Sequence, residues 1–157
     1  MRWQPGTGPG ARKPSTSTRL KRWLANLLAS DGRMRRLLLN EIFTHHATAG
    51  TLMRIPFPDH AIYIDPRDDR IAATLLAGRP WQRHHLERAI ETLRMHNRLA
   101  EGGVFLDIGA NIGALTLYAL LSGAFARSLA VEPDPTNRAL LERNLLENDL
   151  VGQATLL

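Results

Sequence analysis

The chain has 157 residues, the length of one ordinary domain, and 44% of them are hydrophobic, enough to form a core. The absence of cysteine excludes a disulfide framework, a thiolate metal site and a cysteine nucleophile. The net charge of +5 is concentrated in residues 1–40, which contain nine Lys or Arg and one acid, so it gives no reason to expect nucleic-acid binding by the whole domain.

The N-terminal segment combines a polar stretch with a basic helical pattern. Residues 1–18 are rich in Gly, Pro, Ser and Thr, and we expect them to form a disordered basic tail. Apolar residues at helical spacing then predict an amphipathic helix: Leu20, Trp23, Leu24, Leu27 and Leu28. In the favoured interpretation this helix packs against its own domain. In the alternative it makes peripheral contact with a membrane. A secretory signal pattern is missing, so we expect a cytoplasmic protein.

Residues 19–100 are predicted to form a helical and hairpin segment ahead of an α/β domain. Two short apolar runs around a Pro-Asp turn at residues 51–66 predict a β-hairpin. The loop at residues 65–69 can cap a short helix. Residues 82–100 then have the apolar spacing of a long helix.

Residues 101–157 are predicted to form the first half of that α/β domain. The apolar run at residues 103–109 does not alternate, which suits a parallel strand covered on both faces. A helix, a second strand, a second helix and the start of a third strand follow, in the order of a parallel βαβαβ unit. We expect Asp134 to be the N-cap of the second helix, with Pro135 at its first position.

The loop after the first of these strands is the candidate binding site. It lies at the carboxyl end of a parallel strand, where open α/β sheets bind ligands, and its glycines allow a close approach to the backbone. The following helix N-terminus favours an anionic group. An acid at the tip of the next strand is spaced to accept hydrogen bonds from ribose hydroxyls. The predicted cofactor-binding residues are Asp107, Gly109, Ala110, Asn111, Gly113 and Glu132.

The loop differs from the dinucleotide fingerprint G-x-G-x-x-G in two respects. Asn111 stands where the middle glycine would let a pyrophosphate approach, and Asp107 would repel a pyrophosphate. An acid at that place suits a cationic amine instead. S-adenosyl-L-methionine combines a ribose, a carboxylate and an ammonium, so it is the predicted cofactor. An NAD-binding oxidoreductase is the less favoured enzyme alternative.

Three stretches of the chain resemble the FkbM-type family of S-adenosylmethionine-dependent methyltransferases. They are FLDIGANIGALTLYA (residues 105–119), AVEPDPTNRALLERNLLENDL (residues 130–150) and the upstream IYIDPRDDRIAATLLAGRPWQ (residues 62–82). The resemblance implies a Rossmann-like class I methyltransferase fold. It also implies that Asp107, Gly109, Asn111 and Gly113 line the methionine side of the cofactor and that Glu132 meets its ribose.

The resemblance further implies methyl transfer to a hydroxyl of a sugar or secondary metabolite. We therefore expect a small-molecule or glycan acceptor and no specific nucleic acid. The chain supplies only the first strands of a seven-stranded sheet, so we expect an inactive fragment without the catalytic half, and we predict no catalytic residue. The alternative in another class is a non-catalytic remnant whose basic helix binds a partner.

No metal site is predicted. The adjacent histidines at positions 45–46 and 84–85 are expected to diverge on their helices, so that neither pair could hold one ion.

Overall fold

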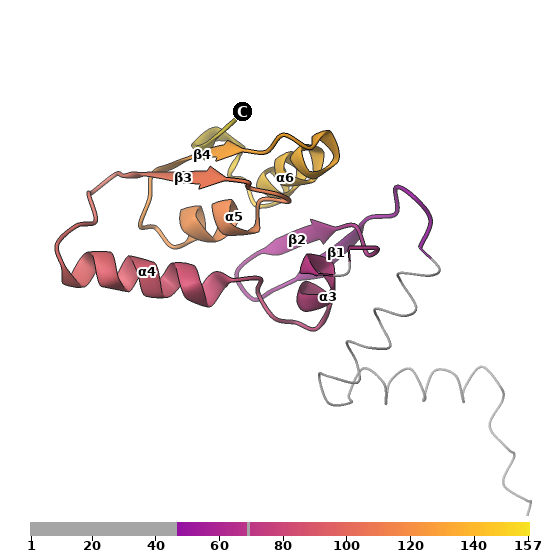
Figure 1. Ribbon diagram of the computed structural model, residues 1–157, viewed down its shortest axis with the longest axis horizontal. Coiled ribbons are helices and arrows are strands. Elements are labelled where there is room, and N and C mark those ends of the chain that lie inside the picture. Colours follow the sequence, from indigo (N-terminus) through magenta and orange to yellow (C-terminus); the bar gives the residue numbers. More distant parts are fainter. Residues whose placement is uncertain (1–46, 69) are drawn as a thin grey trace, which may run out of the picture.

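A computed structural model describes residues 47–68 and 70–157, so the predicted tail and amphipathic helix lie outside the described residues. Ten elements follow one another in this part of the chain (Figure 1). They are β1 (Met53–Pro56), β2 (Ala61–Ile64), α3 (Ile71–Leu76), α4 (Arg83–Met95), β3 (Val104–Ile108), α5 (Ala114–Leu121), β4 (Arg127–Val131), α6 (Pro135–Glu147), the 3-10 turn η1 (Val151–Gln153) and β5 (Ala154–Leu156).

The sheet of the C-terminal part has the predicted parallel topology. Its strand order is β3-β4-β5, with Asp107 beside Ala130 and Ala130 beside Leu156. The predicted α/β fold, a partial Rossmann-like βαβαβ unit, is therefore confirmed. In Figure 1 the sheet lies at the top, α5 lies beneath it and α4 lies beneath α5.

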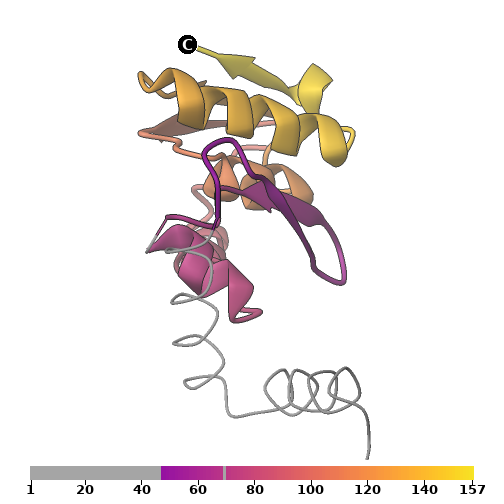
Figure 2. The ribbon, with the colours of Figure 1, turned by 90° about the vertical axis from the view of Figure 1, so that its right-hand side faces the viewer.

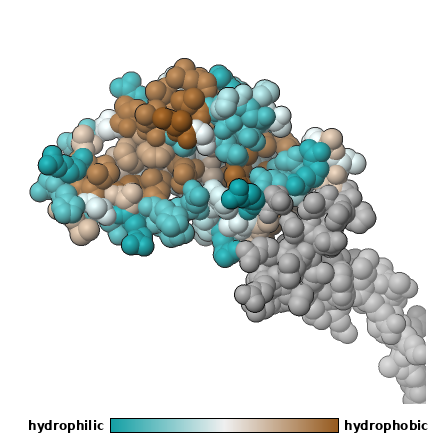
Figure 3. Space-filling view, in the orientation of Figure 1, coloured by the Kyte–Doolittle hydropathy of each residue, from teal (hydrophilic) through white to brown (hydrophobic). Residues whose placement is uncertain are grey.

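Only one face of this sheet is covered by the described residues. Successive residues of a strand point to opposite faces, and Asp107 points to the face where Thr116 of α5 donates a hydrogen bond to it. On the other face Val104, Leu106 and Ile108 are 57%, 55% and 75% exposed, and Figure 3 shows an apolar surface over these strands. The expectation of a strand covered on both faces therefore does not hold here, because sequential right-handed crossovers place α5 and α6 on the same side.

The upstream hairpin forms as predicted and shares a core with the α/β unit. β1 and β2 are antiparallel, with Met53 beside Ile64 and Pro56 beside Ala61. The loop that follows caps α3, because Asp68 Oδ1 accepts hydrogen bonds from the amides of Arg70 at 2.7 Å and Ile71 at 2.9 Å. Residues from both sides of the predicted boundary at residue 100 pack in one apolar cluster. The boundary itself stays a prediction.

Asn144 of α6 and Asn148, the C-cap of that helix, complete the free edge of β2. Asn144 Oδ1 accepts from the amide of Tyr63 at 2.6 Å, and its Nδ2 donates to the carbonyl of Tyr63 at 3.1 Å. Asn148 repeats the pattern on Ala61, at 3.0 Å and 2.7 Å. The spacing of the two asparagines matches the spacing of their partners on the strand, because four residues rise about 6 Å along a helix and two residues rise roughly 6.6 Å along a strand. Figure 2 shows α6 above the hairpin that it contacts.

A side-chain cap fixes the start of one helix, and left-handed residues set the limits of two others. Asp134 caps α6 as predicted, because its Oδ1 accepts from the amides of Thr136 and Asn137. α5 begins only at Ala114, because Asn111 and Gly113 in the preceding loop have positive φ angles of 52° and 82°. α4 stops at Met95, short of the predicted residue 100, because Asn97 is also left-handed at 52°.

His60 makes the stability of this fold depend on pH. Burial lowers the pKa of His60 from 6.5, with the nearby charge of Arg83 acting in the same direction and the hydrogen bond to Asp59 opposing it. Its ring stacks on Phe57 with centroids 4.6 Å apart. The folded state thus binds this proton less readily than the unfolded chain, so stability is present above about pH 6.5 and is lost as the pH falls through the lower folded pKa.

We therefore expect the free energy of unfolding to decrease between about pH 7 and pH 5 in buffered urea titrations. His60→Phe should flatten this profile, because a phenyl ring cannot take up a proton. Asp59 does not obscure the effect, because its hydrogen bond with Arg83 holds its pKa below the usual 3.8 and its contribution changes only in more acid solution. An unchanged slope in His60→Phe would show that another group is responsible.

Candidate cofactor-binding site

The candidate loop is tied to the neighbouring strand through its backbone. The amides of Gly109 and Ala110 both donate to the carbonyl of Val131, at 2.9 Å and 3.0 Å. The amide of Asn111 donates to Glu132 Oε2 at 2.7 Å. The end of β4 therefore holds the first half of the loop in place.

The second half of the loop closes on itself. The amide of Ile112 donates to Asn111 Oδ1 at 2.7 Å, and the amide of Gly113 donates to the carbonyl of Ala110 at 2.8 Å. All five consecutive amides from residue 109 to residue 113 thus have partners inside the protein. A loop that cradles a pyrophosphate instead points free amides at the ligand.

The two loop glycines have different functions. Gly109 has a φ of +79° with nothing within 4 Å of an added Cβ, so space for a ligand remains beside it. At Gly113, with a φ of +82°, an added Cβ would lie 2.9 Å from Leu141 Cγ. The close approach at Gly113 is therefore to α6, and the assignment of this residue to the cofactor stays a prediction.

Glu132 is buried at the tip of β4, where the sequence places it. Besides the amide of Asn111, its carboxylate accepts from the amide of Asp134 at 3.0 Å, through Oε1. These two bonds connect the loop after β3 with the start of α6. A carboxylate has about four acceptor positions, so two remain for a ligand such as a ribose.

Asp107 is buried in the wall of the site. Thr116 Oγ1 donates to its Oδ2 at 2.6 Å. Burial raises the pKa of Asp107 above its usual range, the negative charge of Glu132 adds to the increase, and the Thr116 hydrogen bond opposes it. A raised pKa means that the ionised form lacks stabilisation, which a cation bound beside this carboxylate would supply.

A cavity of about 70 Å³ lies against the loop. Of the predicted site residues, Asp107, Gly109, Ala110 and Asn111 line it, whereas Gly113 and Glu132 do not. Its other wall contains Ile71, Trp81 and Gln82, which sequence analysis did not assign to the site. These three residues reach the site through contacts between distant parts of the chain. The one local sequence signal that could have pointed to them is the aromatic residue Trp81 in the stretch at residues 62–82.

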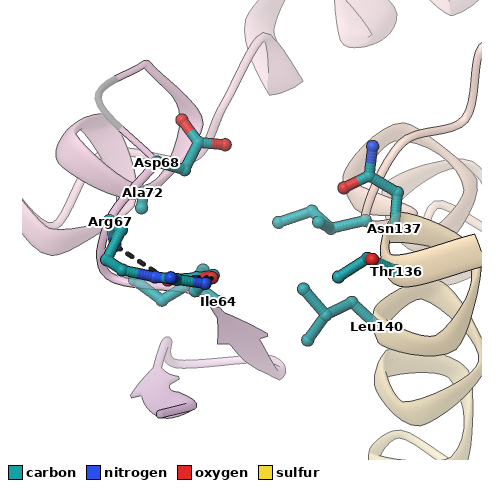
Figure 4. Close-up of a pocket in the computed structure, with 9 residues that line it drawn as sticks. Ile64, Arg67, Asp68, Ala72, Thr136, Asn137 and Leu140 are labelled. Atoms are coloured by element: carbon teal, nitrogen blue, oxygen red, sulfur yellow. Dashed lines mark hydrogen bonds and ion pairs between the residues drawn. The ribbon is translucent and has the colours of Figure 1, made fainter. Parts of the chain in front are cut away.

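A larger cavity of about 270 Å³ lies between the hairpin side and the first turn of α6 (Figure 4). Its charged groups already have partners. Arg67 Nε donates to both oxygens of Asp65, at 3.0 Å and 3.1 Å, and Asp68 caps α3. The amides of Thr136 and Asn137 are used by Asp134. The smaller cavity at the strand ends is therefore the better candidate.

Within the described residues, no group of three or more His, Asp or Glu side chains could hold a metal ion. The expectation that His84 and His85 diverge was wrong, because their ring centroids lie 3.8 Å apart. The pair at 45–46 lies outside the described residues. None of the described helices is long and apolar enough to cross a membrane.

Comparison with known proteins gives structural similarity only. Neither a protein-family model nor a curated protein matches the sequence. Among solved structures, Methanocaldococcus jannaschii Trm5 in complex with adenosine aligns with a TM-score of 0.47 and 15% identity, over 82% of this chain and 40% of that chain. The complex of aTrm5 with tRNALeu aligns with a TM-score of 0.42 and 18% identity, over 69% and 28% of the two chains.

A third similar structure is geranyl diphosphate C-methyltransferase from Streptomyces coelicolor, in complex with Mg²⁺, geranyl diphosphate and S-adenosyl-L-homocysteine. It aligns with a TM-score of 0.36 and 16% identity, over 78% of this chain and 45% of that chain. The present chain thus spans less than half of each of these structures. Two of them contain adenosine or S-adenosyl-L-homocysteine.

One sequence-based prediction is corrected by these comparisons. We expected a small-molecule or glycan acceptor and no specific nucleic acid. The similar structures include a tRNA m1G37 methyltransferase and a methyltransferase bound to tRNA, so that expectation was wrong.

Proposed function

We propose that this chain forms the S-adenosyl-L-methionine-binding part of a methyltransferase. One observation carries the proposal: the loop at residues 109–113 uses all five of its amides internally, while a buried acid, Asp107, lines the cavity beside it. Such a loop offers no free donors to a phosphate and presents a negative charge. It therefore suits a ligand that places a cation at this position, as the ammonium of S-adenosyl-L-methionine would do, whereas NAD would place its anionic pyrophosphate there.

Different residues of the site would bind different parts of the cofactor. A cavity of about 70 Å³ can hold only the amino-acid end of the ligand, because pockets for whole ligands measure roughly 300 Å³ or more. Asp107 would accept hydrogen bonds from the ammonium. The first amides of α5, next to the loop, would meet the carboxylate. The two open acceptor positions of Glu132 would meet the ribose hydroxyls.

Methyl transfer from a sulfonium needs positioning more than it needs reactive protein groups. The acceptor forms a bond to the methyl carbon as the carbon–sulfur bond breaks, and the electron pair of that bond goes to sulfur. This chain would contribute by fixing the cofactor, so that the methyl group has one direction of approach. No described residue is assigned as a base.

The finer parts of the proposal rest on the sequence. Membership of the FkbM-type family is supported by the stretches at residues 105–119 and 130–150, and transfer to a hydroxyl oxygen follows from that resemblance. A cytoplasmic location is supported by the absence of cysteine.

Glu132→Gln should weaken the binding of S-adenosyl-L-homocysteine at least about tenfold in the protein expressed from its complete reading frame, measured by calorimetry. The glutamine has one acceptor oxygen in place of two and no charge. Hydrogen bonds to charged groups contribute about 1.5–3 kcal/mol each, and 1.4 kcal/mol corresponds to a factor of ten.

The matched control is Glu142→Gln, on the exposed side of α6. Glu147 is less suitable, because it accepts a hydrogen bond from Arg54 at 2.6 Å. A Glu132 variant that remains folded and binds the homocysteine product as tightly as the Glu142 variant would mean that Glu132 only holds the backbone together.

A further inference from the structure

A second cavity adjoins the loop cavity. It measures about 360 Å³ and is lined by Thr74, Arg79, Pro80, Trp81, Gln82 and His84. Trp81 and Gln82 also line the cavity at the loop, so the two hollows share a wall. Whatever occupies the outer cavity therefore lies next to the amino-acid end of the proposed cofactor.

The shared wall has a strained and well-supported backbone. Gln82 has a φ of +54°, a left-handed conformation that costs a non-glycine residue about 1–2 kcal/mol. Its carbonyl accepts from the amides of His85 at 2.9 Å and Leu86 at 3.4 Å, and Trp81 packs against the core. Strain of this kind persists where the surroundings enforce it, and it is concentrated at ligand sites.

The charge of the outer cavity favours an anionic ligand. Arg79 lines it and no acid does. Among the ion pairs formed by the described residues, none includes Arg79. The neighbouring Arg83 differs, because it pairs with Asp59 at 2.7 Å and with Glu87 at 3.0 Å. Arg79 is therefore the cation available to a ligand in this cavity.

We propose that the outer cavity binds the methyl acceptor and that the acceptor is a nucleotide of a single-stranded nucleic acid. The assignment of an acceptor here rests on the proposed function. Trp81 and Pro80 supply an apolar wall suited to a flat base, and Arg79 supplies the contact to its phosphate. The side-chain amide of Gln82 can both donate hydrogen bonds to a base edge and accept them from it. A flat ring joined to an anion is the chemistry that this combination recognises.

Photocrosslinking can locate such a ligand directly. A short single-stranded RNA containing 4-thiouridine is irradiated with the full-length protein in the presence of S-adenosyl-L-homocysteine, and the crosslinked peptide is identified by mass spectrometry. We expect crosslinks at residues 79–84. Crosslinks confined to residues 1–40, whose nine basic residues attract any polyanion, would overturn the proposal.

Salt-dependent affinity for the same RNA gives an independent test. Arg79→Ala should weaken binding about tenfold and reduce the slope of log K against log salt by about 1, the effect of losing one phosphate contact. The control is Arg88→Ala on the exposed side of α4, which should leave both quantities unchanged. The basic N-terminal segment contributes equally to both variants, so equal affinities would contradict the proposal.

S-adenosyl-L-homocysteine binding, measured on the same samples, separates this proposal from the function it rests on. Arg79 lines only the outer cavity, so its variant should bind the homocysteine product normally. Normal product binding without an Arg79 effect on RNA refutes the acceptor site alone. Absence of product binding in the unmodified protein refutes the proposed function.

Discussion

Asn144→Ala is expected to lower the free energy of unfolding by about 3–5 kcal/mol. The Asn144 side chain is completely buried and satisfies three backbone groups: the amide and the carbonyl of Tyr63 and the carbonyl of Ile112, the last at 2.8 Å. Alanine leaves all three without a partner, and each unsatisfied buried group costs about 1–3 kcal/mol. Urea titration followed by circular dichroism measures the loss.

Asn148→Ala is the matched control for this prediction. It lies one helical turn later, bonds to the backbone of Ala61 and is only partly buried, so water can replace the lost partners. We expect a loss of about 1–2 kcal/mol. Because Asn144 also holds the carbonyl of Ile112, its variant should in addition bind S-adenosyl-L-homocysteine more weakly. Equal and small losses in the two variants would show that α6 does not secure the hairpin and the loop.

Gly113→Ala is expected to destabilise the fold by about 2–5 kcal/mol in the same measurement. The left-handed backbone costs alanine about 1–2 kcal/mol, and the new methyl group would meet Leu141 Cγ at 2.9 Å inside a packed core, which adds about 1–3 kcal/mol. Leu141 is fully buried, so it has little room to move away.

Gly109→Ala separates the two causes, because its φ of +79° is nearly the same and no atom lies within 4 Å of the added Cβ. We expect a loss of only about 1–2 kcal/mol there, from the backbone alone. Leu141→Ala combined with Gly113→Ala should cost less than the sum of the two single changes, because the shortened side chain leaves room for the methyl group. Additive losses would contradict a direct clash.

The elements that sequence analysis predicted are those with local signals. The start of α6 depends on Asp134 and Pro135, which act within one turn, and the structure has the predicted cap. The hairpin follows from two apolar runs around a Pro-Asp turn. The loop sequence likewise places Asp107, Gly109, Ala110 and Asn111 around one cavity, since consecutive residues at a strand end remain close.

The features that sequence analysis missed depend on contacts far apart in the chain. Asn144 stands in an apolar helical pattern, and nothing nearby shows that it pairs with Tyr63, which is 81 residues away. Trp81 and Gln82 join the site through the packing of the upstream segment, and the left-handed backbone of Gln82 has no sequence signature. The same holds for Glu132, whose bond to the amide of Asn111 appears only when β3 and β4 lie side by side.

Calorimetric titration of the full-length protein with S-adenosyl-L-homocysteine and, separately, with NAD tests the central claim most directly. The internally bonded loop amides and the buried acid at Asp107 predict saturable binding of S-adenosyl-L-homocysteine and no detectable heat from NAD. Saturable NAD binding without a response to S-adenosyl-L-homocysteine would contradict the account, because a pyrophosphate would then occupy a loop that has no free donors for it.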